Sequence, residues 1–322
     1  DLVQALKIIV VRDGKPEMLD LRRDTSDPEE LRLFEAALTS FGAIGILHSI
    51  TIQCKPNFNM FVHMQINPYQ DVKHKILEVA RKSYSVQIAV FAAFPRPMIR
   101  FKTQTPVDPV VPLPVKLGGP SQLETIASYI ALWAYSPVSS FLQKHTARIL
   151  SRFAGSPFIY KQQIQSPHTW LTNWRDGELE TKIIKFVKAT PWINLEYAIP
   201  LERILEAIDQ LLALAYEYRI KHNYKRFLPI IFRPVAADTL GYMSPTKGRE
   251  TAYVDITYDI SDKNDIRFKF FQDVEKILLN LDGRVSWSRL FLKDKSQVIQ
   301  AYPEYYKFLA VKNELDPQNM FS

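Results

Sequence analysis

The feature that most constrains the fold is an apolar strand that runs directly into a long amphipathic helix. The strand reads INLEYAIP over residues 193–200, and the helix reads LERILEAIDQLLALAYEYRIKH over residues 201–222. Apolar residues share one face of this helix: Leu201, Ile204, Leu205, Ile208, Leu211, Leu212 and Ala215. Such a helix is stable only when that face is buried. The segment therefore predicts a core that contains both strands and helices.

Strands and helices are interleaved along the rest of the chain without a regular βαβ order. QALKIIVV and EMLDL flank a turn at Asp13-Gly14, which predicts a hairpin. SDPEELRLFEAAL predicts a helix capped by Ser26 or Asp27. We further expect strands over 46–53 and in MFVHMQI, SVQIAVFAAF, MIRFKTQT, 158–199 and GRVSWSRLF; helices over 72–82, 122–152 and 266–281 and in YPEYYKFLAVKNEL; and a Pro-rich connector over 105–120. This order predicts an α+β fold.

Composition excludes several classes of protein. The 322 residues suffice for one large or two ordinary domains, and the formal charge of +7 comes without long basic runs, so nucleic acid is not an expected partner. Cys54 is the one cysteine, which excludes an internal disulfide and a cysteine cluster for zinc or iron–sulfur, and is compatible with reducing surroundings. The sequence has no run of 18 apolar residues, so it predicts no transmembrane span. The histidines show no metal-binding spacing, and no Walker loop or Gly-x-Ser-x-Gly elbow is present.

One arginine interrupts an otherwise apolar strand in LPIIFRPVAADTLGYMSPTKGRETAY, residues 228–253. Arg233 lies among Ile, Phe and Val, where an unpaired charge is costly. It needs an anionic or polar partner, which is either a carboxylate of the protein or a ligand. Arg249 lies in the loop that follows and either lines it or contributes to a site.

Three further segments combine residues typical of sites. Glu196 ends an apolar strand, so it is either a proton acceptor for a substrate hydroxyl or a partner in an ion pair. Gly42 and Gly45 stand between a helix and a strand, where they allow either close approach of a cofactor or a tight turn. In DGRVSWSRLF, alternation places Ser286 beside Arg284 and opposite Trp287 and Arg289; the alternative is cation–π packing on a surface.

Five runs in this order resemble the sugar-lactone and alditol oxidase branch of the vanillyl-alcohol-oxidase-type flavoproteins, the gulonolactone and arabinonolactone oxidases among them. The runs are SFGAIGILHSITIQCKPNF, LEYAIPLE, FRPVAADTLGYMSPTKGRETAYVDI, DGRVSWSRLF and YPEYYKFLAVKNELDPQNMFS. The resemblance implies the C-terminal part of a PCMH-type FAD-binding domain over residues 1–57. It further implies a cap, or substrate, domain with a large antiparallel sheet flanked by helices over 58–265, and a C-terminal segment returning to the FAD domain over 266–322.

The resemblance also implies a cofactor and a partner. FAD is the expected cofactor and a small molecule the expected substrate. The family's N-terminal phosphate-binding loop has no match here, so we expect an N-terminal FAD-domain segment to be supplied in the same polypeptide or by a separate chain.

The family's chemistry is hydride transfer from a hydroxyl-bearing carbon to flavin. Its catalytic strand reads Glu-x-Arg, and Arg233 matches the arginine, whereas Ile231 stands at the glutamate's position. Ser286 and Arg289 stand at the positions of a family histidine and lysine. The resemblance thus implies three sets of site residues: catalytic Arg233, Glu196, Ser286 and Arg289; substrate-binding Ile231, Tyr197, Ser244, Arg249 and Trp287; and cofactor-binding Gly42, Ala43, Gly45 and Ile46.

The replaced glutamate and histidine leave three hypotheses. The first is an FAD-dependent oxidoreductase that acts on a substrate less polar than a sugar lactone. The second is a flavin-free descendant whose pocket binds or cyclises a small molecule. The third is a non-catalytic partner subunit.

Overall fold

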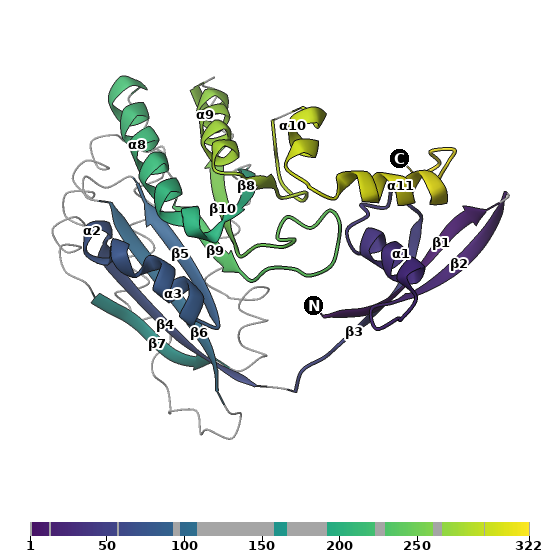
Figure 1. Cartoon of the computed structure of the whole chain (residues 1–322). Coiled ribbons are helices and arrows are strands. Elements are labelled where there is room, and N and C mark those ends of the chain that lie inside the picture. The colour runs from purple at the N-terminus through teal and green to yellow at the C-terminus, as the bar shows by residue number, and fades with distance from the viewer. Residues whose placement is uncertain are drawn as a thin grey trace.

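The computed structural model contains a small sheet near the N-terminus and a large sheet, with C-terminal helices that bridge the two (Figure 1). It describes residues 2–12, 14–56, 58–92, 97–107, 158–165, 192–222, 229–259, 266–292 and 294–321. The expected connector after residue 107 and the helices expected over 122–152 lie outside these residues. No helix in the described ranges is long and apolar enough to cross a membrane.

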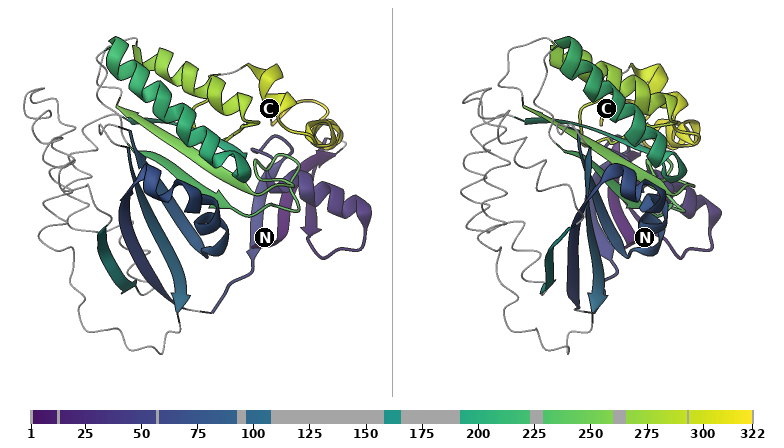
Figure 2. Two further views of the ribbon diagram at one scale, coloured as in Figure 1. Left: turned by 60° about the vertical axis from the view of Figure 1, so that its left-hand side comes forward. Right: turned by 90° about the vertical axis from the view of Figure 1, so that its left-hand side faces the viewer.

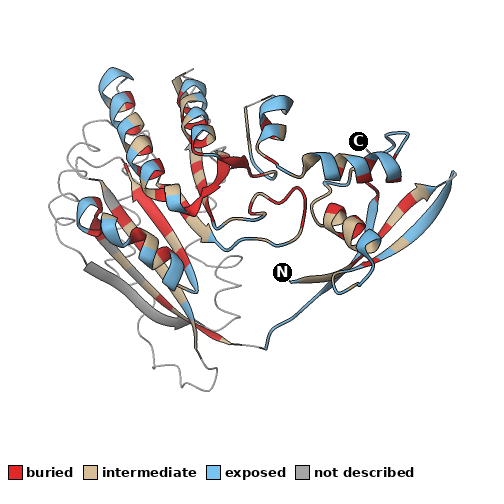
Figure 3. Cartoon of the chain, in the orientation of Figure 1, coloured by how far each residue is buried: buried red, intermediate tan, exposed pale blue. Residues whose placement is uncertain are grey.

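The small sheet is antiparallel and has three strands, in the order β2 (Lys15–Arg22), β1 (Val3–Arg12), β3 (Ile46–Ile52). Helix α1 (Pro28–Leu38) packs against β1 and β2, and its Phe34 is fully buried. Asp27 caps this helix by accepting a hydrogen bond from the backbone N–H of Glu29 at 2.9 Å. The predicted hairpin and capped helix are therefore confirmed. Every residue of β3 is exposed, as the pale blue strand in Figure 3 shows.

The large sheet is antiparallel throughout the pairs that the structure describes. Its strand order is β11 (Arg284–Val285), β8 (Trp192–Pro200), β10 (Thr251–Asp259), β9 (Ile230–Val235), β5 (Ser85–Phe91), β6 (Met98–Val107), β4 (Asn59–Pro68), β7 (Phe158–Gln165). Strands β5 and β9 lie far apart in the sequence but pair in the middle of the sheet, so distant parts of the chain meet there.

Helices cover one face of this sheet (Figure 2). They are α2 (Tyr69–Val72), α3 (Ile76–Lys82), α8 (Ile204–His222) and α9 (Ile266–Asn280), with short 3₁₀ turns at Lys73–Lys75 and Leu201–Arg203. Phe232 of β9 and Ile88 of β5 pair across the sheet and are fully buried on the helical side. The predicted amphipathic helix is confirmed as α8, and its buried face includes Ile204, Ile208 and Leu211.

The C-terminal segment returns to the small sheet. Helix α10 (Lys295–Gln300) precedes α11 (Tyr305–Leu315), and α11 contacts both α1 and β1. An ion pair between Arg32 and Glu314 joins α1 to α11. Lys247, in the loop after β9, forms ion pairs with Glu35 of α1 at 2.8 Å and with Glu304, just before α11, at 3.3 Å. This one lysine therefore connects the large sheet to both helices.

Three predicted elements differ from the structure. The helix expected over 72–82 is divided by the 3₁₀ turn at Lys73–Lys75. The strand expected in GRVSWSRLF is only Arg284–Val285, because the chain then turns, with the N–H of Arg289 bonded to the carbonyl of Ser286. Helix α10 was not predicted because six residues are too few to show a helical period.

Candidate active site

Three neighbouring strands place charged residues on the face of the large sheet that lies away from the helices. Tyr197 of β8 hydrogen-bonds to Glu275 of α9, so Glu196 before it points to the opposite face. Glu196 pairs with Asp255 of β10, and Asp255 pairs in turn with Ile231 of β9. Arg233 lies two residues beyond Ile231 on the same face. Register therefore gathers two carboxylates and one guanidinium, and we call this group the strand-face cluster: Glu196, Arg233 and Asp255.

The guanidinium of Arg233 holds this cluster together. It forms a direct ion pair with Glu196 and lies 3.6 Å from the carboxylate of Asp255. The Glu196 side chain is 6% exposed and that of Asp255 13%, whereas that of Arg233 is 42% exposed. The partner that Arg233 required is therefore a carboxylate of the protein, and part of the Arg233 side chain remains exposed.

Burial changes the acid–base properties of the cluster. The pKa of Asp255 is raised, first by burial and then by the charge of Glu196, although Arg233 and Arg289 oppose the shift. Burial, together with Glu196, raises the pKa of Tyr253 to about 12, so this neighbour of the cluster stays protonated at neutral pH. Oδ1 of Asp255 is buried and has no hydrogen-bond partner among the described residues. An acceptor of this kind fits a ligand that donates a hydrogen bond.

Ser286 and Arg289 lie at the edge of the same site. The backbone N–H of Ser286 donates to the carbonyl of Glu196 at 3.0 Å, which holds the two residues side by side. Arg289 is close enough to Asp255 to lower its pKa. The structure thus brings together all four residues expected to be catalytic: Arg233, Glu196, Ser286 and Arg289.

Sequence reasoning missed Asp255. The signal that singled out Arg233 was present here too, since Asp255 is an acidic residue inside the apolar strand TAYVDITY. A buried charge in an apolar strand needs a partner, and the two strands that carry such a charge, β9 and β10, are paired with each other.

Arg249 and Arg284 form a second, mostly structural group of cations. Arg249 donates to the carbonyl of Ala198 at 2.9 Å, two residues beyond Glu196. Burial, together with the nearby charge of Arg284, lowers the pKa of Arg249 to about 10. Arg284 donates to three backbone carbonyls, those of Ala301, Pro245 and Lys247, and so joins the sheet to the loop and the tail.

Two residues expected to bind substrate have other partners. Tyr197, expected to bind substrate, is instead fully buried on the helical side, where Glu275 accepts the hydrogen bond of its hydroxyl; strand alternation places it opposite Glu196. Ser244 donates to Asp238 at 2.5 Å, and Thr246 contacts the same carboxylate oxygen at 2.6 Å. The Ser244 hydroxyl therefore stabilises the loop between β9 and β10.

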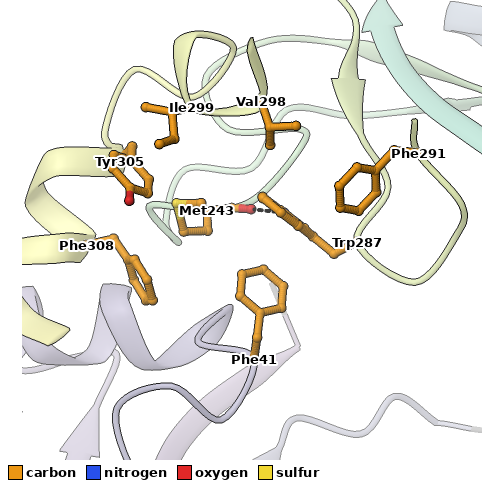
Figure 4. A pocket seen from close by; sticks show the side chains of 8 residues that line it. All are labelled: Phe41, Met243, Trp287, Phe291, Val298, Ile299, Tyr305 and Phe308. Carbon is orange, nitrogen blue, oxygen red and sulfur yellow. Dashed lines mark hydrogen bonds between the residues drawn. The ribbon is translucent and has the colours of Figure 1, made fainter. Parts of the chain in front are cut away.

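Trp287 belongs to an apolar cavity of about 340 Å³ (Figure 4). Its ring lies 4.7 Å from that of Phe41, and its indole N–H donates to the carbonyl of Met243 at 3.0 Å. The lining comes from the turn after α1, the loop after β9, the segment after β11 and the two C-terminal helices: Phe41, Met243, Trp287, Phe291, Val298, Ile299, Tyr305 and Phe308. The cavity is thus lined by segments next to the small sheet and by segments next to the large sheet.

The two glycines in the turn after α1 differ in the space around them. Gly42 has φ +78°, and a Cβ built there meets no atom within 4 Å. A Cβ at Gly45 lies only 2.5 Å from the carbonyl oxygen of Ile9, so Gly45 is required by close packing on β1. Ala43 donates its N–H to Ser40 at 2.8 Å, and Ile46 is 58% exposed. The Gly42 side of this turn is therefore open, and the neighbouring Phe41 contacts Trp287.

Comparison with known proteins places the chain in a family. The family described as D-arabinono-1,4-lactone oxidase matches residues 50–322, more than half of the chain. The chain belongs to this family. The predicted membership of the sugar-lactone oxidase branch is thereby confirmed.

Relatives and a solved structure agree with this membership. L-gulono-1,4-lactone dehydrogenase of Mycobacterium tuberculosis (strain ATCC 25618 / H37Rv) is 22% identical over 94% of the chain and 66% of the relative. L-gulonolactone oxidase of Mus musculus is 21% identical over 92% of the chain and 63% of the relative. The chain thus spans less than two thirds of either. A solvent-stable cholesterol oxidase aligns with a TM-score of 0.63 at 14% identity, covering 100% of this chain and 68% of that one, which confirms the α+β fold.

Proposed function

We propose that this chain carries the substrate site of an FAD-dependent oxidoreductase that removes hydrogen from a hydroxyl-bearing carbon. The observation that supports this proposal best is the strand-face cluster. One guanidinium and two carboxylates lie on a single sheet face in a member of a lactone oxidase family. A substrate alcohol needs this combination, because its oxygen accepts a hydrogen bond while its proton is taken up.

The residues of the chain have separate roles in this proposal. The exposed part of Arg233 binds the substrate oxygen, and Arg289 adds positive charge beside it. Ser286 orients the substrate from the sheet edge, and a carboxylate of the cluster receives the hydroxyl proton. Gly42, Ala43 and Ile46 hold FAD on the open side of their turn, with Gly45 shaping that turn. FAD, when bound, supplies the acceptor for the hydride.

The substrate is less polar than a sugar lactone. Ile231 is half-buried on the same face as the cluster, and its cross-strand neighbours are Asp255 and the fully buried Ala89. An apolar surface beside the charged group favours a substrate that has carbon rather than a second hydroxyl at this position.

The proposal includes an additional FAD-domain segment, supplied in the same polypeptide or by a separate chain. Strand β3 is an edge strand whose apolar residues Ile46, Leu47 and Ile52 are all more than half exposed. Edge strands of this kind are usually covered, because they attract other strands. In this proposal residues 1–57 belong to the FAD domain, residues 58–265 form the cap, and residues 266–322 return to the FAD domain.

A visible absorption spectrum with an intact-mass measurement on the native protein tests this function. We expect flavin absorbance, and its bleaching by an oxidisable alcohol in the absence of oxygen. A colourless preparation of the complete polypeptide, or a flavin that no alcohol or lactone in a broad panel reduces, would contradict the proposal. The first result points to a flavin-free binding protein and the second to a non-catalytic subunit, neither of which the family match favours.

A further inference from the structure

Glu196 and Asp255 both lie within reach of a substrate at the strand-face cluster, but their environments differ. We infer that Oδ1 of Asp255 is the atom that accepts the hydrogen bond, and then the proton, of the substrate hydroxyl. This inference rests on the proposed function and goes beyond it, because it selects one carboxylate and predicts which neighbouring position can replace it.

The hydrogen-bond pattern separates the two carboxylates. Glu196 is joined to the guanidinium of Arg233, and its backbone carbonyl is bound by Ser286. Asp255 approaches the same guanidinium only through Oδ2, at 3.6 Å. Its Oδ1 is buried and has no hydrogen-bond partner in the described part of the chain. A buried acceptor without a partner is rare in folded proteins, and the hydroxyl of a bound ligand would satisfy this one.

Charges from each neighbouring strand set the proton affinity of Asp255. Burial, and then the charge of Glu196 on β8, favour the protonated form, while Arg233 on β9 and Arg289 after β11 favour the ionised form. Tyr253, on the same strand, stays protonated. The balance leaves a carboxylate that binds a proton more readily than an exposed aspartate does, which suits a group that must receive one.

Strand register makes position 231 equivalent to position 255. Ile231 and Asp255 are directly paired, so their side chains rise from the same face about 5 Å apart. A longer carboxylate at 231 can therefore present an acceptor beside Oδ1 of residue 255. If Asp255 is the acceptor, a glutamate at 231 should replace it when residue 255 is asparagine. With Asp255 present, the two adjacent carboxylates would repel each other.

The test is a four-protein cycle of the wild type, Asp255→Asn, Ile231→Glu and the double variant. Each full-length protein, with any flavin reduced beforehand to prevent turnover, is titrated in a calorimeter with cyclohexanol. Cyclohexanone is the matched ligand, because it has similar size but no hydroxyl to donate. Asp273→Asn is the control variant, since Asp273 bonds Tyr218 in the helical layer.

We expect Asp255→Asn to weaken cyclohexanol binding roughly tenfold, because a neutral amide oxygen is a weaker acceptor than a carboxylate, and to cause no comparable loss for cyclohexanone, which has no hydroxyl to donate. The double variant should recover most of the loss, whereas Ile231→Glu alone should bind worse than wild type. Turnover of Asp255→Asn should fall by roughly 10²–10⁴-fold.

Three results would overturn the inference: no binding of cyclohexanol by the wild type, equal loss of both ligands in Asp255→Asn, or a double variant no better than Asp255→Asn. The spectrum of the same sample keeps the two proposals apart. A colourless protein with the expected cycle retains Asp255 as the hydroxyl acceptor and removes oxidation, and a yellow protein without the cycle does the reverse.

Discussion

Removing Arg233 tests whether the strand-face cluster is one electrostatic unit. In Arg233→Ala, Glu196 and Asp255 face each other across neighbouring strands with no cation between them. Breaking a buried ion pair costs roughly 3–5 kcal/mol, and an exposed pair contributes about 0–1 kcal/mol. The carboxylates are buried but the arginine is 42% exposed, so we expect a loss of about 2 kcal/mol in the free energy of unfolding. A protein of ordinary stability, about 5–15 kcal/mol, remains folded after this loss.

The loss should depend on pH in a defined direction. The pKa of folded Asp255 is already raised, and Arg233 lowers it, so the substitution raises it further. Between the ordinary aspartate value and this raised value, the folded state binds more protons than the unfolded state, and stability falls as pH rises. The penalty of Arg233→Ala is therefore largest at about pH 7 and smaller at about pH 5.

Urea unfolding of the variants at both pH values measures this effect. Arg203→Ala is the matched control, because Arg203 pairs with Glu206 and Asp282, whose side chains are 47% and 72% exposed. Asp255→Asn in the Arg233→Ala background should restore about half of the lost stability by removing one of two repelling charges. If Arg233→Ala costs no more than Arg203→Ala, or if its cost is the same at both pH values, the cluster is not a coupled unit. Substrate binding should be lost in Arg233→Ala at either pH.

Three further substitutions test the placement of other residues. Tyr197→Phe should lower the free energy of unfolding by about 1–3 kcal/mol, because Glu275 is 1% exposed and loses a partner, while substrate affinity stays unchanged; a changed affinity with unchanged stability would return Tyr197 to the site. Gly45→Ala should destabilise the small sheet by more than about 1 kcal/mol, since the new Cβ would lie 2.5 Å from Ile9 O, and Gly42→Ala, which meets no atom, is its control in thermal unfolding. Lys247→Met should weaken the connection of the large sheet to α1 and α11, because Lys247 pairs with Glu35 and Glu304. Limited proteolysis should then cleave near residues 53–56 faster than in Lys307→Met, and equal cleavage of both variants would argue against this connection.

Local elements could be predicted from the sequence where periodicity and caps agree. Asp27 before Pro28 fixed the start of α1, and the apolar spacing from Ile204 identified α8. Two features could not be predicted: the division of residues 69–82 into short helices and the short helix α10. Elements this short do not show a hydrophobic period long enough to detect.

The site was predicted in part, for a physical reason. A charge inside an apolar strand shows that a partner exists, so Arg233 was found from its own strand. Which partner it has depends on register between strands that are far apart in sequence, and Asp255 becomes visible only when β9, β10 and β8 are paired. Alternation within one strand would already have separated Glu196 from Tyr197.

Register also explains how this chain keeps a carboxylate beside Arg233 although position 231 is apolar. On one face of a sheet, a side chain is as close to its partner across the strand pair as to its neighbour two residues along its own strand. Asp255 pairs with Ile231 and lies 3.6 Å from Arg233, so a carboxylate on the neighbouring strand lies beside the arginine. Ile231 is half-buried beside Asp255, whereas its partner on β5, Ala89, is fully buried, so Ile231 supplies the apolar surface next to the carboxylate. Under the proposed function, a substrate with its hydroxyl at Asp255 would place carbon against Ile231, so we expect selectivity for less polar alcohols and dependence on Asp255 to change together in the same variants.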